Sequence, residues 1–108
     1  MLGEIVTVTV ERPLGSYHPE PKNLYYPINY GYIPGVLGGD GEELDVYLVG
    51  VDEPVNRYTC KIIGVVHRMN DVEDKLVGAP DGIAFSSEEI ATAIDFQEKY
   101  YKTKIETE

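Results

Sequence analysis

Residues 25–50 read YYPINYGYIPGVLGGDGEELDVYLVG, an aromatic stretch that runs into a dense acidic turn. The segment 24–33 is rich in Tyr and Ile and suits a β-strand, and Pro34–Gly35 ends it. The glycines of GGDGEE permit a tight turn, and residues 44–51 again favour a strand. The stretch therefore predicts two strands joined by a turn that carries its carboxylates.

Three further strands are predicted outside this stretch. The alternating run EIVTVTV at residues 4–10 is typical of a half-buried strand. The apolar runs at 57–68 and 75–79 indicate two more. Five strands in a chain of this size suggest a small, closed, Greek-key-like barrel.

The C-terminal part changes period. Ser86 followed by Glu89 forms a capping-box pattern, and the apolar spacing after it predicts a helix over about 87–101. The fold class is therefore mainly β with one helix (α+β). A length of 108 residues fits a single domain over residues 1–108.

Composition excludes several classes of protein. A formal net charge of −10 argues against a general nucleic-acid binder and against binding to anionic membranes. No apolar run is long enough for a membrane span, and the alternating start does not resemble a signal peptide. The single cysteine, Cys60, lies in an apolar run and is expected to be a buried structural thiol. Together these features predict a cytoplasmic protein.

The acidic turn indicates a metal site. Asp40, Glu42 and Asp45 lie within six residues and could point to one side. Two carboxylates about 4 Å apart repel by roughly 1 kcal/mol in water and by about 4 kcal/mol at an effective dielectric near 20, so convergence requires a cation. Oxygen-only ligands favour Mg²⁺ or Mn²⁺ over zinc. The alternative is a solvated acidic hairpin turn.

A second acidic run comes directly before a lysine. Asp71, Glu73 and Asp74 precede Lys75 in MNDVEDKL. Carboxylates for a metal beside a lysine for phosphate are what a phosphoryl-transfer site needs. The alternative is a surface turn.

Several of these motifs resemble one protein family. YPINYGYI followed by DGEELDV is similar to the signatures of the family I soluble inorganic pyrophosphatases. VERP at 10–13, M-x-D at 69–71, DKLV with AP at 74–80 and the terminal FQEKYY match in the same order. The resemblance implies an OB-like five-stranded closed barrel with a C-terminal helix. It also implies Mg²⁺-dependent (or Mn²⁺-dependent) hydrolysis of pyrophosphate to two orthophosphates by a metal-activated water, in a homo-oligomer.

The resemblance also implies roles for individual residues. The metal ligands by position are Asp40, Asp45, Asp71, Asp74 and Glu11. Glu42 occupies the place of the aspartate that takes a proton from the attacking water, and Tyr30 that of an active-site tyrosine. The substrate-binding candidates are Lys75, Tyr100, Lys102, Tyr26, His18 and Lys22.

The sequence departs from the family pattern in its cationic residues. GSYHPEPKNL replaces a region that carries a lysine and an arginine in the family, and Tyr101 stands where the family has a lysine. Arg12 and Arg68 could supply charge instead, or could pair with surface acids. His18 could contact phosphate or pack beside Tyr17. Two alternatives to pyrophosphate hydrolysis follow: a weak or inactive relative that binds a phosphorylated ligand, and a hydrolase for another substrate such as a nucleoside polyphosphate.

Overall fold

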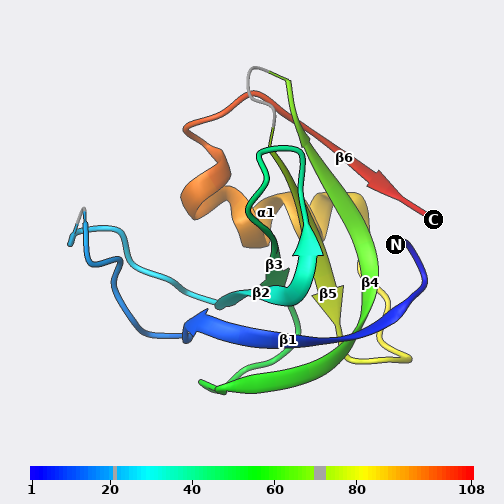
Figure 1. Ribbon diagram of the computed structural model, residues 1–108, viewed down its shortest axis with the longest axis horizontal. Helices are drawn as coiled ribbons and strands as arrows, with labels where there is room; N and C mark the ends of the chain where they lie inside the picture. The colour runs from blue at the N-terminus through cyan, green and yellow to red at the C-terminus, as the bar shows by residue number, and fades with distance from the viewer. Residues whose placement is uncertain (21, 70–72) are drawn as a thin grey trace.

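The computed structural model of the protein describes residues 1–20, 22–69 and 73–108 (Figure 1). Asp71, one of the candidate metal ligands, lies outside the described residues. The elements in chain order are β1 (Ile5–Arg12), β2 (Asn29–Leu37), β3 (Glu43–Leu48), β4 (Arg57–Arg68), β5 (Asp74–Ala79), α1 (Ser87–Glu98) and β6 (Thr103–Thr107). The five predicted strands and the helix are present, and β6 is an additional strand. The predicted bounds of the aromatic strand are wrong, because β2 begins at Asn29 and continues through Pro34–Gly35 to Leu37.

The first five strands close into a barrel. Their order is β1-β2-β3-β5-β4, and β1 pairs with β4 to complete the circle. The β3–β5 pairing is parallel. Strand β4 makes the closure possible because it is long: its N-terminal half pairs with β1 and its C-terminal half with β5. The predicted five-stranded closed barrel with a C-terminal helix is confirmed.

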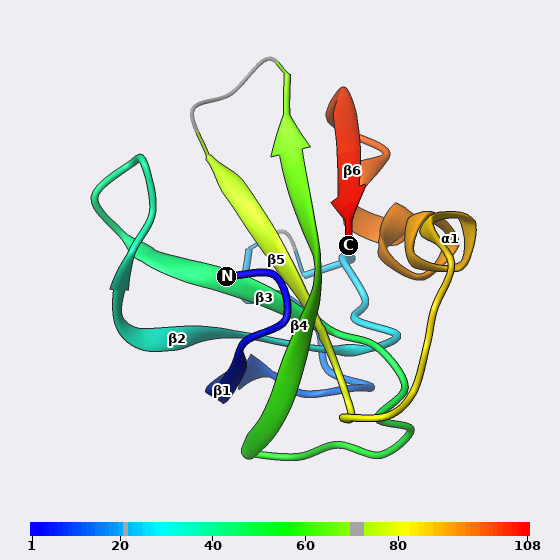
Figure 2. The same cartoon turned by 90° about the vertical axis from the view of Figure 1, so that its right-hand side faces the viewer.

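Strand β6 extends the sheet at the end of the chain. It pairs antiparallel with the C-terminal half of β4, from Gly64 to Arg68. Figure 2 shows β6 beside α1, away from the β2–β3 hairpin. Its sequence, TKIET, contains a single apolar residue and is largely exposed. A strand of this kind is stabilised by pairing with its neighbour, so hydrophobic periodicity gives no signal for it.

The helix begins where the sequence predicts and ends earlier. Ser86 Oγ accepts a hydrogen bond from the Glu89 backbone, and Glu89 Oε1 accepts one from the Ser86 backbone, which confirms the capping box. Helix α1 ends at Glu98, three residues before the predicted end. Its buried face consists of Ile90, Ile94 and Glu98. Within the described residues, no helix has the combination of length and apolar character that crossing a membrane requires.

Tyrosines connect the core to the helix. The rings of Tyr30 and Tyr47 are 5.0 Å apart and those of Tyr26 and Tyr30 are 5.5 Å apart, and all three belong to the core cluster that contains Ile90 of α1. Between them in sequence, Gly31 permits close strand approach, because a Cβ there would overlap the backbone oxygen of Thr9. The aromatic strand β2 can therefore pair closely with β1 at this position.

A second core cluster fills the barrel interior. It includes Val8, Val46 and Cys60, which are each at most 1% exposed. Burial raises the pKa of the Cys60 thiol to about 11. The expectation that Cys60 is a buried structural thiol is confirmed.

Candidate active site

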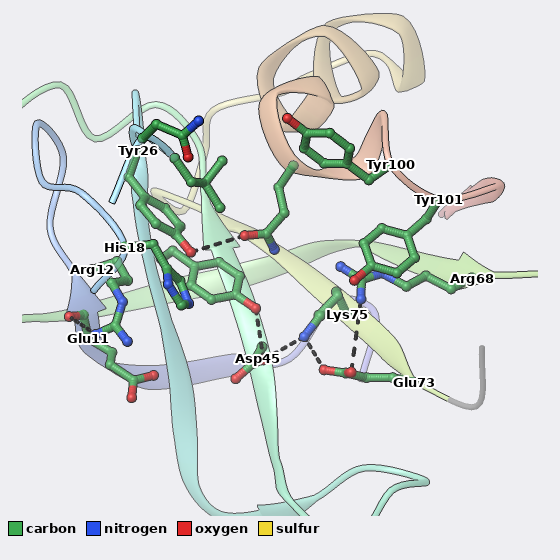
Figure 3. A pocket seen from close by; sticks show the side chains of 14 residues that line it. Glu11, Arg12, His18, Tyr26, Asp45, Arg68, Glu73, Lys75, Tyr100 and Tyr101 are labelled. Carbon is green, nitrogen blue, oxygen red and sulfur yellow. Dashed lines mark hydrogen bonds and ion pairs between the residues drawn. The ribbon is translucent and has the colours of Figure 1, made fainter. Parts of the chain in front are cut away.

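One pocket of about 750 Å³ opens between the barrel and the C-terminal end of α1 (Figure 3). Its charged lining residues are of both signs. Three carboxylates and three cations share the wall: Glu11, Asp45, Glu73, Arg12, Arg68 and Lys75. The ring-bearing residues of the wall are His18, Tyr26, Tyr30, Tyr100 and Tyr101.

Asp45 lies at the base of this pocket between two donors. Lys75 Nζ on β5 donates to Asp45 Oδ2 at 2.6 Å, and the Tyr30 hydroxyl on β2 donates to the same oxygen at 2.8 Å. Burial and the Asp45 charge raise the pKa of Tyr30 far above its ordinary value. Tyr30 therefore stays protonated at neutral pH and acts as a donor that orients Asp45.

Glu73, and not Asp74, accompanies Lys75 in the pocket. Side chains alternate between the two faces of a strand, so residues 73 and 75 share a face. Lys75 Nζ pairs with Glu73 Oε1 as well as with Asp45. Asp74 faces the other way, and its Oδ2 lies 3.1 Å from His67 Nδ1, from which it accepts a hydrogen bond when that nitrogen carries the proton. The structure therefore does not bring Asp74, a predicted metal ligand, to the cluster, and it brings Glu73 instead.

Asp40 and Glu42 lie in the exposed hairpin turn between β2 and β3 and outside the described pocket wall. The Asp40 side chain accepts a hydrogen bond from the Glu42 backbone at 3.0 Å, and Gly41 has a φ of +81°. Carboxylates at a turn bond its backbone in this way. The pairing of β2 with β3 shifts between Tyr32 and Leu37, so the tip departs from the regular strands. Of the three candidate residues Asp40, Glu42 and Asp45, the structure places only Asp45 in the pocket.

Arg68 is a second nearly buried cation of the pocket, beside Lys75. Its residue exposure is 6%, and that of its partner Glu98 on α1 is 4%. Arg68 Nε and Nη2 donate to the two carboxylate oxygens of Glu98 at 3.1 and 2.6 Å. Burial alone would lower the pKa of Arg68, but the hydrogen bonds and charge of Glu98 outweigh it and raise the pKa. The arginine is thus a permanent cation in a fixed place, paired with the buried Glu98 and, at 3.9 Å, with the partly exposed Glu73.

The end of α1 also fixes the aromatic wall. The Tyr26 hydroxyl donates to Gln97 Oε1 at 3.0 Å, and Gln97 Nε2 donates to the Tyr47 hydroxyl at 2.8 Å. Tyr47 in turn donates to Glu98. Burial is the main cause that raises the pKa of both tyrosines. This hydrogen-bond chain holds the predicted substrate residue Tyr26 as part of the wall, with its hydroxyl already engaged.

The remaining predicted substrate residues divide into two groups. His18 and Tyr100 line the pocket. His18 packs near Tyr26, with ring centroids 6.4 Å apart and planes 20° apart, and its Nδ1 accepts from the Glu20 backbone, which leaves Nε2 as the ring donor. Lys22 and Lys102 are exposed and are not part of the described wall.

The donor set fits a hard cation in part. Asp45 and Glu73 both contact the Lys75 ammonium, so their oxygens already converge on a positive charge. Oxygen donors are what Mg²⁺ and Mn²⁺ prefer. Among residues 1–20, 22–69 and 73–108, however, no three His, Cys, Asp or Glu side chains are grouped closely enough to hold an ion. Asp45 and Glu73, with Glu11 on the same wall, are the described residues that could contribute ligands.

Sequence reasoning included Glu73 only as part of the second acidic run, and it assigned no role in the site to Gln97, Glu98 or Tyr101. A signal existed for the positions of Glu73 and Glu98. Glu73 lies two residues before Lys75, which is the strand period. Glu98 follows Ile90 and Ile94 at the spacing of the buried helix face, and a carboxylate at such a position requires a buried partner.

Comparison with known proteins places these features in a family. The family model described as inorganic pyrophosphatase matches residues 8–106. A relative from Neisseria meningitidis named inorganic pyrophosphatase is 32% identical over 130 aligned positions, covering 93% of this chain and 73% of the relative. One from Haemophilus influenzae with the same name is 35% identical, covering 70% of this chain and 54% of the relative.

Solved structures agree at the level of the fold. An inorganic pyrophosphatase from Neisseria gonorrhoeae superposes with a TM-score of 0.69 at 28% identity, covering 91% of this chain and 74% of that one. The inorganic pyrophosphatase from Ehrlichia chaffeensis superposes with a TM-score of 0.73 at 20% identity, covering 99% of this chain and 88% of that one. At this level of identity the similarity shows the fold alone. With nearly its whole length matched by the family model and a barrel of the same form, the chain belongs to the inorganic pyrophosphatase family.

Proposed function

We propose that the protein hydrolyses inorganic pyrophosphate to two orthophosphates with the help of Mg²⁺. The observation that carries the proposal is the pair of carboxylates, Asp45 and Glu73, that converge on Lys75 in a pocket with further cations on its wall. Family membership supports the reaction, and the oxygen-only donor set supports Mg²⁺, with Mn²⁺ as a second candidate.

Asp45 is suited to hold a cation on one of its oxygens. Both of its hydrogen bonds, from Tyr30 and from Lys75, fall on Oδ2. Among the described residues none falls on Oδ1, so that oxygen is available as a ligand. When bound, Mg²⁺ would neutralise phosphate charge and lower the pKa of a coordinated water. Asp45 and Glu73 would hold it, joined in the proposal by Glu11 and by Asp71.

The cations of the wall give an acidic protein access to an anionic substrate. The chain as a whole carries a formal charge of −10, which repels pyrophosphate. Lys75, Arg12 and Arg68 oppose that repulsion locally, and His18 Nε2 adds a hydrogen-bond donor. We assign these groups, together with the Tyr100 hydroxyl, to the phosphate oxygens.

The reaction balances with the groups of the pocket. The oxygen of a water bonds to one phosphorus, the bridging P–O bond breaks, and the leaving orthophosphate keeps the bridging oxygen. The water proton passes to a pocket carboxylate, for which Glu73 is our candidate, because Glu42 lies in the exposed turn. Tyr30 takes no proton in this scheme, since its raised pKa keeps it a donor.

Orthophosphate release from pyrophosphate, measured with Mg²⁺ and again with EDTA, tests the proposal. Release that starts with Mg²⁺, is restored in part by Mn²⁺ and stops with EDTA is the expected result. A folded protein that releases no orthophosphate with either ion would contradict it. A homo-oligomeric state and a cytoplasmic location stay predictions.

A further inference from the structure

We infer that the pocket accepts nucleoside di- and triphosphates, with the base on the ring of Tyr101 and the phosphates over Lys75. The inference rests on the proposed function for the chemistry at the phosphate end. Its own support is the exposed ring of Tyr101, to which the proposed function assigns no role.

Tyr101 is a preorganised aromatic surface. The Arg68 guanidinium lies 3.7 Å from its ring centroid, and Arg68 is itself fixed by two hydrogen bonds to the buried Glu98 (Figure 3). Arg68 therefore supports one face of the ring, while the side chain as a whole stays 38% exposed. A ring held in this way loses little freedom when a planar ligand packs against it, which favours binding.

The neighbouring Tyr100 also has a cation beside its ring. Tyr100 lines the pocket, is 68% exposed, and has Lys99 Nζ 5.4 Å from its ring centroid. In Figure 3, Tyr100 and Tyr101 lie across the pocket from Tyr26 and His18. Two exposed rings beside a phosphate-binding floor match a ligand that joins a planar ring system to phosphates.

The dimensions also fit a larger ligand than pyrophosphate. Pockets of about 300–1,000 Å³ enclose ligands of drug size, and this one measures about 750 Å³. Figure 3 shows Tyr101 over Arg68, and Arg68 also lies 3.9 Å from Glu73 of the charged floor, so the aromatic and charged parts of the wall adjoin. A nucleoside polyphosphate can therefore occupy both parts at once.

Hydrolysis of a nucleoside polyphosphate would follow the same steps as the proposed hydrolysis of pyrophosphate. The water oxygen bonds to the terminal phosphorus, the bond from that phosphorus to the bridging oxygen breaks, and the bridging oxygen leaves with the shortened nucleotide. The products from a nucleoside triphosphate are a nucleoside diphosphate and one orthophosphate, and the water proton goes to the same carboxylate as with pyrophosphate.

The test compares two substrates that differ only in the presence of a nucleoside. Adenosine triphosphate and inorganic tripolyphosphate share the phosphoanhydride chain, and kcat/KM and Kd are measured for both. Stacking of one base on one aromatic ring is expected to favour the nucleotide by about 5- to 150-fold. Tyr101→Leu should remove this preference, Tyr101→Phe should keep it, and Tyr25→Leu, a change of an exposed tyrosine outside the described pocket wall, should also keep it.

Each outcome decides the inference separately from the proposed function. Pyrophosphate turnover without any preference for the nucleotide, or a preference that survives Tyr101→Leu, would overturn the inference and leave the proposed function intact. If no substrate is hydrolysed, the proposed function fails, and the ratio of the two Kd values still decides whether Tyr101 is a base-binding surface. Circular dichroism of each variant confirms that it is folded.

Discussion

Lys75 and Asp45 form an ion pair of 2.6 Å that joins two neighbouring strands of the barrel. The lysine side chain is almost fully buried, and it also contacts Glu73, so two carboxylates share one ammonium. Strand β3 pairs in parallel with β5, which brings Asp45 of the acidic turn motif next to Lys75, which follows the second acidic run. Two motifs far apart in the sequence thereby form one site.

Lys75→Met is expected to lower the free energy of unfolding in a way that Mg²⁺ reverses. Without the ammonium, Asp45 and Glu73 repel each other, which should cost about 1–3 kcal/mol. A bound divalent cation would replace the lost charge, so Mg²⁺ should stabilise the variant more than the wild type. Urea unfolding with and without Mg²⁺ measures this, with the exposed Lys104→Met as the control. Equal effects of Mg²⁺ on all three proteins would contradict the shared cation site.

Separate substitutions of the neighbouring acids Glu73 and Asp74 test which face of the chain at the start of β5 carries the catalytic carboxylate. Glu73→Gln should reduce pyrophosphate turnover by at least about tenfold, because it removes a pocket carboxylate that contacts Lys75. Asp74→Asn should change turnover by less than about twofold, because Asp74 lies on the other face against His67. Steady-state kinetics of the pair gives the answer. A larger loss for Asp74→Asn would favour the assignment made from the sequence.

The sequence was sufficient for the barrel and for part of the site. Alternation, turns and the capping box predict five strands and one helix, and the resemblance adds the fold and the pocket residues Asp45, Tyr30 and Lys75. The side-chain register around Lys75 was not predicted, because an acidic run gives the ligand type without the strand face. Strand β6 was missed since an exposed edge strand depends on its neighbour.

The support of the pocket by α1 was the least predictable feature. The pair Arg68–Glu98 joins residues thirty positions apart, and neither periodicity nor composition pairs them. Only the buried position of Glu98 on the helix indicates that such a partner must exist.

Glu98→Gln is expected to destabilise the fold strongly. The change removes the charge of the carboxylate that pairs most closely with the buried Arg68, and breaking a buried ion pair costs about 3–5 kcal/mol. Glu88→Gln, at an exposed position of the same helix, should have little effect. Chemical denaturation of the two variants measures the difference. A similar free energy of unfolding for both would show that the pair contributes little.

His67 should make stability decrease at alkaline pH. Its hydrogen bond to Glu106 is the largest cause that raises the pKa, and Asp74 adds to it. A pKa raised on folding contributes stability that is complete below the unfolded value of about 6.5. That stability is lost as the pH rises through the folded pKa. Thermal unfolding of wild type and His67→Asn from pH 5 to 9 should therefore converge at the alkaline end, and parallel curves would exclude the effect.

The most direct test of the account is orthophosphate release from pyrophosphate by wild type and by Asp45→Asn in the presence of Mg²⁺. The variant keeps the size of the side chain but loses the charge that would hold the cation and that pairs with Lys75. Asp52→Asn, an exposed acid outside the described pocket wall, serves as the control. The account predicts a loss of at least about a hundredfold for Asp45→Asn, in line with removal of a group that supports charge in the transition state, and none for the control. Full activity of a folded Asp45→Asn protein would contradict the central role of this carboxylate.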